Sequence, residues 1–274
     1  MASPSNLLVR VITAAIGAPA IIALLYMGPA WGWFALLLAA AAIGSIELFG
    51  MTHPEDRVAQ RFGTALTVVT ITLLWMFAAD ARALLTLLFA IPMVAMFSVL
   101  LRLGDMRTAA LRMMAMAFGP FYLGVGFGAT ALLRRDAGAD GPAYVVFALM
   151  LAWLSDTGGY FAGRWLGKHK LYEAVSPKKT IEGSIGGLVA TSLGAILAHA
   201  FFLKSLPLSD GIALALVAGA LGQAGDLGES VLKRSFGVKD SGGILPGHGG
   251  ILDRVDAVLV TAPITYAYVM WVRG

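Results

Sequence analysis

About nine runs of roughly 20 mostly apolar residues recur along this 274-residue chain. A helix of that length crosses the ~30 Å hydrocarbon core of a bilayer. Backbone polar groups in lipid must be satisfied within the segment, and the runs lack the alternation typical of barrel strands. We therefore predict an all-α polytopic integral membrane protein with about nine transmembrane helices. The expected spans are residues 8–28, 30–50, 62–79, 83–101, 111–132, 142–162, 183–203, 209–229 and 252–272.

The composition excludes several other classes of protein. The chain is 58% hydrophobic and only 13% charged, which a soluble globule does not need. It has no cysteine, so disulfide frameworks, thiolate nucleophiles and cysteine-based metal sites are excluded. The net charge of +4 is weakly basic, but in a membrane chain basic residues mainly report topology and phosphate chemistry. We do not expect nucleic-acid binding.

The basic residues predict the orientation in the membrane. With nine spans, fifteen of the 20 Lys and Arg residues fall on one face. The positive-inside rule makes that face cytoplasmic, with the amino terminus inside and the carboxy terminus outside. A basic residue, Arg10, followed by an apolar run is also the pattern with which a cleaved signal peptide begins. A second apolar run follows almost at once, so we expect the first span to remain uncleaved. The five basic residues of the other face are Arg82, Arg134, Arg135, Lys204 and Arg273.

The chain divides into two regions by its chemistry. Residues 1–140 are expected to form about five spans with short connections, and Glu47 is their main intramembrane charge. Residues 141–274 are expected to form the catalytic transmembrane region. Its cytoplasmic loops, 163–182 and 231–251, are too glycine-rich and too patterned to be simple connectors.

A first group of polar residues lies near the cytoplasmic end of span 209–229. On a helix, Asp226, Glu229, Ser230 and Lys233 share one face. A carboxylate in or near the bilayer should be paired, hydrated or metal-bound. The alternative for Glu229 and Lys233 is a structural ion pair that closes the helix at the membrane interface.

A second group opens the last span, in "HGGILDRVDA". Asp253 and Asp256 stand three residues apart at an expected helix start, where free N–H groups favour anions. Capping needs only one acid, so two acids beside Arg254 and opposite Asp226 indicate an oxygen cage for a divalent cation. Oxygen ligands without cysteine favour Mg²⁺ over Zn²⁺.

The glycines before this helix predict a phosphate-binding loop. Glycine lets backbone N–H groups approach a ligand closely, although no Walker A sequence occurs and a simple chain-reversing turn is the alternative. Clustered cations and metal-binding acids would suit a polyphosphate. His248 is expected to be structural or a phosphate donor rather than a metal ligand. The candidate substrate-binding residues of this region are Lys233, Arg234, Lys239, His248, Gly249, Gly250 and Arg254.

A third group lies in loop 163–182 and just before it. Asp156 interrupts an apolar span, and "SPKKT" presents Lys178 and Lys179 beside two hydroxyl residues. The lysines are either purely topogenic or part of the site. Because this loop shares its face with loop 231–251, we expect the two loops to close over one site.

The stretch "SVLKRSFGVKDSGGILPGHGGILDRVD", from Ser230 to Asp256, resembles the signature of the phosphatidate cytidylyltransferases, or CDP-diacylglycerol synthases. Every fixed position of that long pattern is present. "SDTGGYFAGRWLGKHK" and the "SPKKT" segment also resemble family stretches, so the likeness covers about residues 150–260. Ile181 departs from the aromatic residue usual before "EG", which puts local packing or lipid fit in question.

The resemblance implies a Mg²⁺-dependent, commonly dimeric membrane enzyme that converts CTP and phosphatidate to CDP-diacylglycerol and pyrophosphate. By the family pattern, Asp226, Asp253 and Asp256 would be the metal ligands and catalytic acids, and a monovalent cation such as K⁺ can accompany Mg²⁺. Rival functions are a CTP-dependent enzyme acting on another lipid phosphate or on a lipid alcohol, an ion-coupled transporter, and an inactive scaffold. Acids gathered at one face, and not at the midplane, argue against the transporter.

Overall fold

The computed structural model describes residues 17–243 and 249–273, and these are almost entirely helical. Seven helices are long and apolar enough to cross a membrane, as expected of an integral membrane protein. They match seven of the predicted spans, whereas the first and last predicted spans correspond to shorter apolar helices over Gly17–Met27 and Val258–Arg273. The long helices are α2 (Ala30–Thr52), α3 (Arg57–Phe77), α4 (Ala81–Leu101), α5 (Met106–Asp136), α6 (Gly141–Leu166), α7 (Ile181–Phe201) and α8 (Leu208–Ser235).

The described residues form an all-α fold with one short element that the sequence did not predict. Loop 163–182 contains a two-stranded antiparallel hairpin, formed by β1 (Lys170–Tyr172) and β2 (Ser176–Thr180). The lysine-rich "SPKKT" motif is β2 itself, so its side chains are held by strand pairing. The carboxy-terminal part adds a single helical turn, α9 (Leu252–Val255), and then α10 (Val258–Tyr268).

The helix starts follow from short polar residues in the connections. Asp56, Asp80 and Asp105 each accept hydrogen bonds from backbone N–H groups of the following first turn. At α7, the Thr180 hydroxyl does the same for the N–H of Gly183. Side-chain caps of this kind satisfy donors that the helix itself leaves free.

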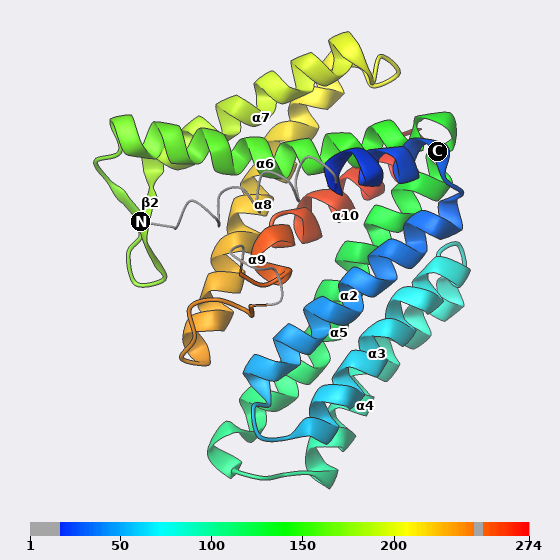
Figure 1. The fold of residues 1–274 in the computed structure, drawn as a ribbon, viewed down its shortest axis with the longest axis vertical. Helices are drawn as coiled ribbons and strands as arrows, with labels where there is room; N and C mark the ends of the chain where they lie inside the picture. The colour runs from blue at the N-terminus through cyan, green and yellow to red at the C-terminus, as the bar shows by residue number, and fades with distance from the viewer. Residues whose placement is uncertain (1–16, 244–248, 274) are drawn as a thin grey trace.

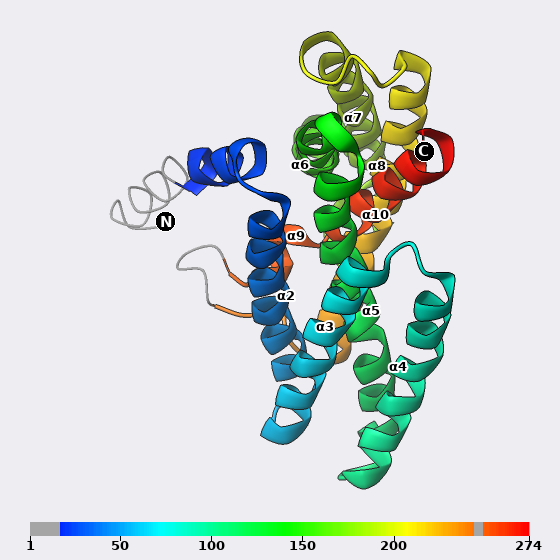
Figure 2. The same ribbon diagram turned by 90° about the vertical axis from the view of Figure 1, so that its right-hand side faces the viewer.

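The helices form two groups. α2, α3, α4 and α5 lie side by side, and the α2–α3 and α4–α5 connections are together at the lower end in Figure 1. α6 and α7 cross the upper end, and α8 descends from them (Figure 1). Turning the molecule shows α10 between the two groups, in contact with α5, α6 and α8, while α9 lies beside α2 (Figure 2). The carboxy-terminal elements therefore join the two halves.

α6 and α7 pack unusually closely through small residues. A side chain added at Gly186 would come within 2.2 Å of the Ala162 Cβ atom, and one at Gly158 within 2.5 Å of the Ala190 Cβ atom. Such small-residue contacts let helix backbones approach in lipid, where apolar burial alone gives little driving force. This contact holds the hairpin-bearing ends of α6 and α7 together.

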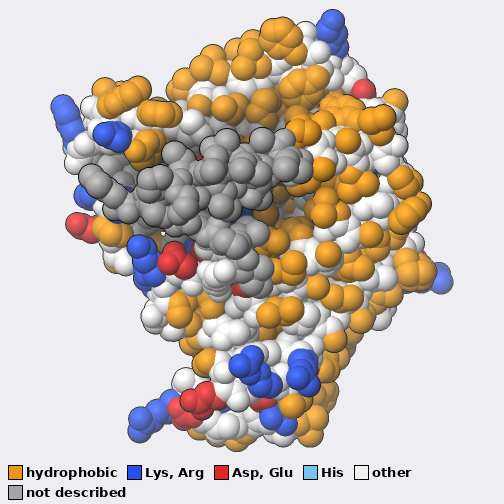
Figure 3. Space-filling view, in the orientation of Figure 1, with side chains coloured by type: hydrophobic (Ala, Val, Ile, Leu, Met, Phe, Trp, Pro, Cys, Tyr) orange, Lys and Arg blue, Asp and Glu red, His pale blue; other side chains and the backbone are white. Residues whose placement is uncertain are grey.

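Large apolar side chains cover much of the outer surface, including Leu101, Trp165 and Phe201 at 86%, 73% and 77% exposure. Figure 3 shows apolar side chains over the upper, central and right-hand parts of one face, with Lys and Arg side chains at its lower end and at its edges. A large apolar surface with charges at its margins is the surface that a bilayer favours.

Candidate functional site

Acidic and basic side chains from four separate segments meet near the carboxyl end of α8. We call this group the acidic site. It combines the three polar groups that the sequence suggested. The Lys179–Asp226 ion pair connects the third group to the first, and the Lys233–Asp253 ion pair connects the first to the second. Its members are Asp156, Lys179, Asp226, Glu229, Lys233, Asp253 and Asp256.

The hairpin is tied to α8 by one of these ion pairs. The Lys179 ammonium donates a hydrogen bond to a carboxylate oxygen of Asp226. Strand β2 places Lys179 there, while its neighbour Lys178 is exposed. Of the two lysines predicted for the site, the structure thus pairs one directly with a predicted acid.

Lys233 connects α8 to the last polar segment. Its ammonium lies 2.6 Å from an Asp253 oxygen and 3.1 Å from a Glu229 oxygen, and the Lys233 and Glu229 side chains are only 11% and 1% exposed. The Glu229–Lys233 pair, which the sequence offered as the structural alternative, is present, but it is one arm of a larger bridge. A buried pair of this kind is costly to break, since the remaining charge is left uncompensated.

Asp253 organises the glycine-rich segment. One of its oxygens pairs with Lys233, and the other accepts hydrogen bonds from the Ser241 N–H (3.0 Å), the Ser241 hydroxyl (2.9 Å) and the Gly250 N–H (3.1 Å). Gly249 has φ of +81° and lies close to the same carboxylate, so a side chain there would be strained and crowded. These contacts fix the position of the Asp253 carboxylate.

Glu47 reaches the same segment from α2, in the other half of the molecule. It is 5% exposed, and its carboxylate accepts hydrogen bonds from the Ile251 N–H (3.0 Å), the Leu252 N–H (3.1 Å) and the Ser241 hydroxyl (3.3 Å). A side chain at Gly250 would come within 2.6 Å of it. The sequence marked Glu47 only as an isolated charge. Its need for partners in an apolar helix was the signal for this role.

Negative charge exceeds positive charge at the acidic site. Asp256 accepts a hydrogen bond from the Ala257 N–H (2.7 Å) and is repelled by Glu229, Asp226 and Asp156. The site's seven members include two lysines. Among the described residues, no three His, Asp or Glu side chains already form a group arranged to hold a metal ion. The convergence of Asp226, Asp253 and Asp256 on one ion therefore stays a prediction.

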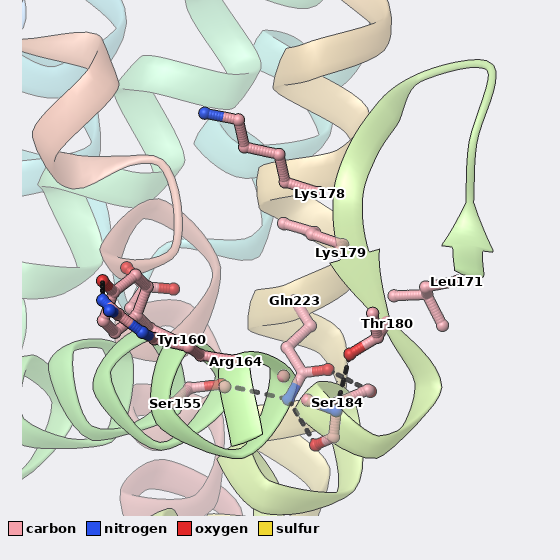
Figure 4. Close-up of a pocket in the computed structure, with 13 residues that line it drawn as sticks. Ser155, Tyr160, Arg164, Leu171, Lys178, Lys179, Thr180, Ser184 and Gln223 are labelled. Atoms are coloured by element: carbon pink, nitrogen blue, oxygen red, sulfur yellow. Dashed lines mark hydrogen bonds between the residues drawn. The ribbon is translucent and has the colours of Figure 1, made fainter. Parts of the chain in front are cut away.

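A cavity of about 390 Å³ lies beside this site, between α6, β2, α7 and α8 (Figure 4). Lys178, Lys179 and Asp156 border it. Its polar wall is a network in which the Gln223 amide donates to the Ser155 hydroxyl and to the Ser184 carbonyl, both at 3.1 Å, and accepts from the Ser184 hydroxyl. Sequence reasoning missed Gln223, whose only signal was an amide within an apolar helix.

The remaining predicted residues are placed less centrally. Arg234 is exposed and donates to the Val238 carbonyl at 3.2 Å, and Lys239 and Arg254 are also exposed. The N–H of Gly250 is directed to Asp253. His248 lies outside the described residues.

The sequence is similar to one known protein family over most of its length. A family described as the cytidylyltransferase family matches residues 8–272. Relatives named phosphatidate cytidylyltransferase include one from Staphylococcus saprophyticus, 43% identical over 143 residues, and one from Staphylococcus haemolyticus, 45% identical over 143 residues. One from Staphylococcus aureus (strain COL) is 45% identical over 144 residues. Each similarity covers 52% of this chain and 54% of the relative, so the chain matches about half the length of these relatives.

Proposed function

Because the chain belongs to the cytidylyltransferase family, we propose that it is a phosphatidate cytidylyltransferase. It would transfer the cytidylyl group of CTP to phosphatidate and produce CDP-diacylglycerol and pyrophosphate. The relatives' names support this substrate pair. The observation that carries the proposal is the acidic site, in which the Lys179–Asp226 and Lys233–Asp253 pairs bring three sequence motifs to one place beside a cavity.

The site suits a reaction between two anions. A phosphate monoester oxygen of phosphatidate attacks the α-phosphorus of CTP, and the bond from that phosphorus to the oxygen bridging to the β-phosphorus breaks. Pyrophosphate leaves with the electron pair. The monoester is already largely ionised near neutral pH, because its second pKa is about 6. No strong general base is needed, and we assign none.

The work of the protein is therefore to bring the anions together and to stabilise the departing charge. Lys178 and Lys179 border the cavity and would contact phosphate groups there. The other cations proposed for substrate phosphates lie on the segments around the acidic site. They are Lys233, Arg234, Lys239 and Arg254, together with His248 and the backbone of Gly249 and Gly250.

We propose Mg²⁺ as the cofactor, held by Asp226, Asp253 and Asp256, with a monovalent cation such as K⁺ as a possible companion. The excess of carboxylates over lysines supports a cation at this place. Carboxylate oxygens are ligands that Mg²⁺ accepts. When bound, the ion would supply positive charge to the phosphate oxygens.

The proposed setting is the inner membrane, with nine spans, the amino terminus inside and the site facing the cytoplasm. The α2–α3 and α4–α5 connections and the carboxyl end of α8 all lie toward one end of the molecule (Figure 1), as this orientation requires. CTP would then reach the site from water and phosphatidate from the inner leaflet. We also propose a homodimer, on the family resemblance alone.

Product analysis tests the proposal. The purified protein would be incubated with CTP, Mg²⁺ and phosphatidate in mixed micelles, and pyrophosphate and CDP-diacylglycerol would be measured together. We expect equal amounts of both products. Release of CDP with a phosphorylated lipid would indicate a lipid kinase instead, and turnover with only another lipid phosphate would change the substrate. No CTP consumption with any lipid would contradict the proposal.

A further inference from the structure

A second cavity, of about 290 Å³, lies in the amino-terminal half, between α3, α4 and the start of α5. We call it the arginine pocket. None of its lining residues belongs to the acidic site or to the cavity beside it. Its lining residues include His53 and Asp56 in the α2–α3 connection and Leu101 and Arg102 at the end of α4. These segments lie at the lower end of the molecule in Figure 1.

Most of the arginine pocket is apolar and open to the surroundings of the protein. Phe62 on α3 and Phe97 and Leu101 on α4 line it, and they are 40%, 56% and 86% exposed. On helices that cross a membrane, such surfaces face hydrocarbon. An acyl chain is therefore the ligand part that this wall accommodates.

The other end of the pocket is positively charged. Arg102 is neutralised by Asp56 at 2.9 Å. Arg112 donates to the carbonyl oxygens of Arg102, Leu103 and Asp105 and to the Thr108 hydroxyl, but none of the ion pairs in the described part of the chain includes it. Among the described residues, no carboxylate therefore neutralises its charge.

A buried histidine at this polar end lacks one partner. His53 lines the pocket, is 2% exposed, and its Nδ1 atom lies 2.8 Å from the Thr52 hydroxyl. Among the described residues, nothing hydrogen-bonds its Nε2 atom. Burial, together with the charge of Arg112, lowers the pKa of His53 to about 4, so the imidazole is neutral at pH 7. An unpaired buried nitrogen is costly and indicates a missing partner.

We propose that the arginine pocket binds an anionic glycerophospholipid, with an acyl chain between α3 and α4 and the phosphate at Arg112. The unpaired Nε2 atom of His53, which lines the same pocket, would hydrogen-bond one of the ligand's oxygens. Two further exposed arginines, Arg57 and Arg61, lie at the start of α3 and add attraction for an anion. A phosphate bearing an acyl chain matches both ends of the pocket. Free phosphate matches only one.

Lipid retention measured by native mass spectrometry tests this site without reference to enzyme activity. The detergent-purified protein would be incubated with phosphatidylglycerol or with phosphatidylcholine, which has no net charge. Phosphatidylglycerol is chosen because it is not a substrate of the proposed reaction. We expect one phosphatidylglycerol to be retained about tenfold more strongly than phosphatidylcholine.

Arg112→Gln should reduce phosphatidylglycerol retention to the phosphatidylcholine level. Arg107→Gln is the matched control, since Arg107 is on the same helix but does not line the pocket, and it should retain the lipid. The proposal would be overturned if the unmodified protein retained the two lipids equally. It would also be overturned if Arg112→Gln retained as much phosphatidylglycerol as the unmodified protein. Displacement of the lipid by millimolar inorganic phosphate would indicate a simple phosphate site, which also overturns it.

A second measurement serves if Arg112→Gln does not fold. Phe97→Trp places a fluorescent reporter at the exposed apolar wall, and the unmodified protein supplies the background of the six native tryptophans. Phosphatidylglycerol brominated on its acyl chain should quench the added fluorescence more than brominated phosphatidylcholine. Equal quenching would show that ordinary surrounding lipid, and not a specific anionic lipid, occupies the pocket.

Discussion

The two halves of this protein are similarly apolar but use their charges differently. In the α2–α5 half, Arg102 pairs with Asp56, and these side chains are 49% and 20% exposed at helix ends. In the α6–α10 half, Lys233 and Glu229 are 11% and 1% exposed, and Lys233 also reaches Asp253. Ion pairs at the surface contribute little to stability, whereas buried pairs are costly to form and to break.

The difference indicates where the protein concentrates its chemistry. Exposed ion pairs near helix ends can simply connect neighbouring helix ends, as Asp56 does when it caps α3 and pairs with Arg102. A bridge that collects Lys233, Glu229 and Asp253 in one place needs another reason, and the proposed phosphate-binding site would supply it. Glu47 is the exception in the first half, because its carboxylate is buried and is turned toward the second half.

The largest effect should come from a change in the acidic site itself. Asp256→Asn keeps the shape of the side chain but removes a charge that Mg²⁺ would require. We expect CTP-dependent turnover to fall by at least ~100-fold, a loss typical of removing a directly stabilising group. Turnover would be followed by pyrophosphate release, and folding by gel filtration in detergent.

The matched control is Asp210→Asn, on the first turn of α8, where Asp210 accepts a hydrogen bond from the Tyr268 hydroxyl at 2.7 Å. It should retain turnover within about twofold. An Asp256→Asn protein as active as the unmodified one would remove the proposed metal role.

The next largest effect should be on stability. Lys233→Met leaves Glu229 and Asp253 buried without their shared cation. Breaking a buried pair in this way costs about 3–5 kcal/mol. The melting temperature Tm should therefore fall by at least ~5 °C in a detergent melting experiment.

Lys239→Met is the control, because Lys239 is exposed and follows α8 on the same segment. It should leave Tm within a degree or so. An equal fall in both variants would contradict a special role for the buried bridge.

Glu47 tests whether the first half supports the second. In Glu47→Gln, an amide group replaces one of two oxygens that accept from Ser241, Ile251 and Leu252, so at least one buried donor loses its partner. That costs about 1–3 kcal/mol. We expect turnover to fall about tenfold, with faster proteolysis near residues 241–251.

Ser45→Ala is the control, because it is on the same helix and removes only a hydrogen bond to the Ala42 carbonyl. It should change neither turnover nor proteolysis. Unchanged turnover in Glu47→Gln would show that α2 is not needed for the site.

Much of the fold could be predicted because one physical requirement dominates it. Apolar runs about 20 residues long must be helical in lipid. Seven of those predicted correspond to helices long enough to cross a membrane. The hairpin was missed because β1 and β2 are only 3 and 5 residues long and carry no apolar alternation. Strands this short depend on their surroundings more than on local preference.

The site was predictable only where residues lie close in sequence. Helical spacing places Glu229 beside Lys233, and the structure confirms that pair. The contacts of Glu47 with residues about 200 positions later could not be inferred from spacing, because they depend on how α2 packs against α9. Gln223 was overlooked for the same reason, since its partners Ser155 and Ser184 come from two other helices.

The smallest effect should be at the exposed pair of the first half. The side-chain hydrogen bond from Arg102, opposed in part by burial, lowers the pKa of Asp56 below its usual 3.8. A lowered folded-state pKa adds stability above the unfolded pKa, and this stability is lost as the pH falls through the folded pKa. Asp56→Asn keeps the cap on α3 but removes the charge, so Tm at pH 7 should fall by only about 1–2 °C.

That small difference in Tm should disappear once the pH has fallen through the lowered folded-state pKa of Asp56, because Asp56 is then itself protonated and resembles Asn. Asp80→Asn is the control, because Asp80 caps α4 through the N–H groups of Arg82 and Ala83 in the same way, and the described ion pairs do not include it. At pH 7 it should lower Tm by less than Asp56→Asn does. If Asp56→Asn lowered Tm as much as Lys233→Met does, the exposed and buried ion pairs would contribute equally to stability. The two halves would then differ only in where their ion pairs lie.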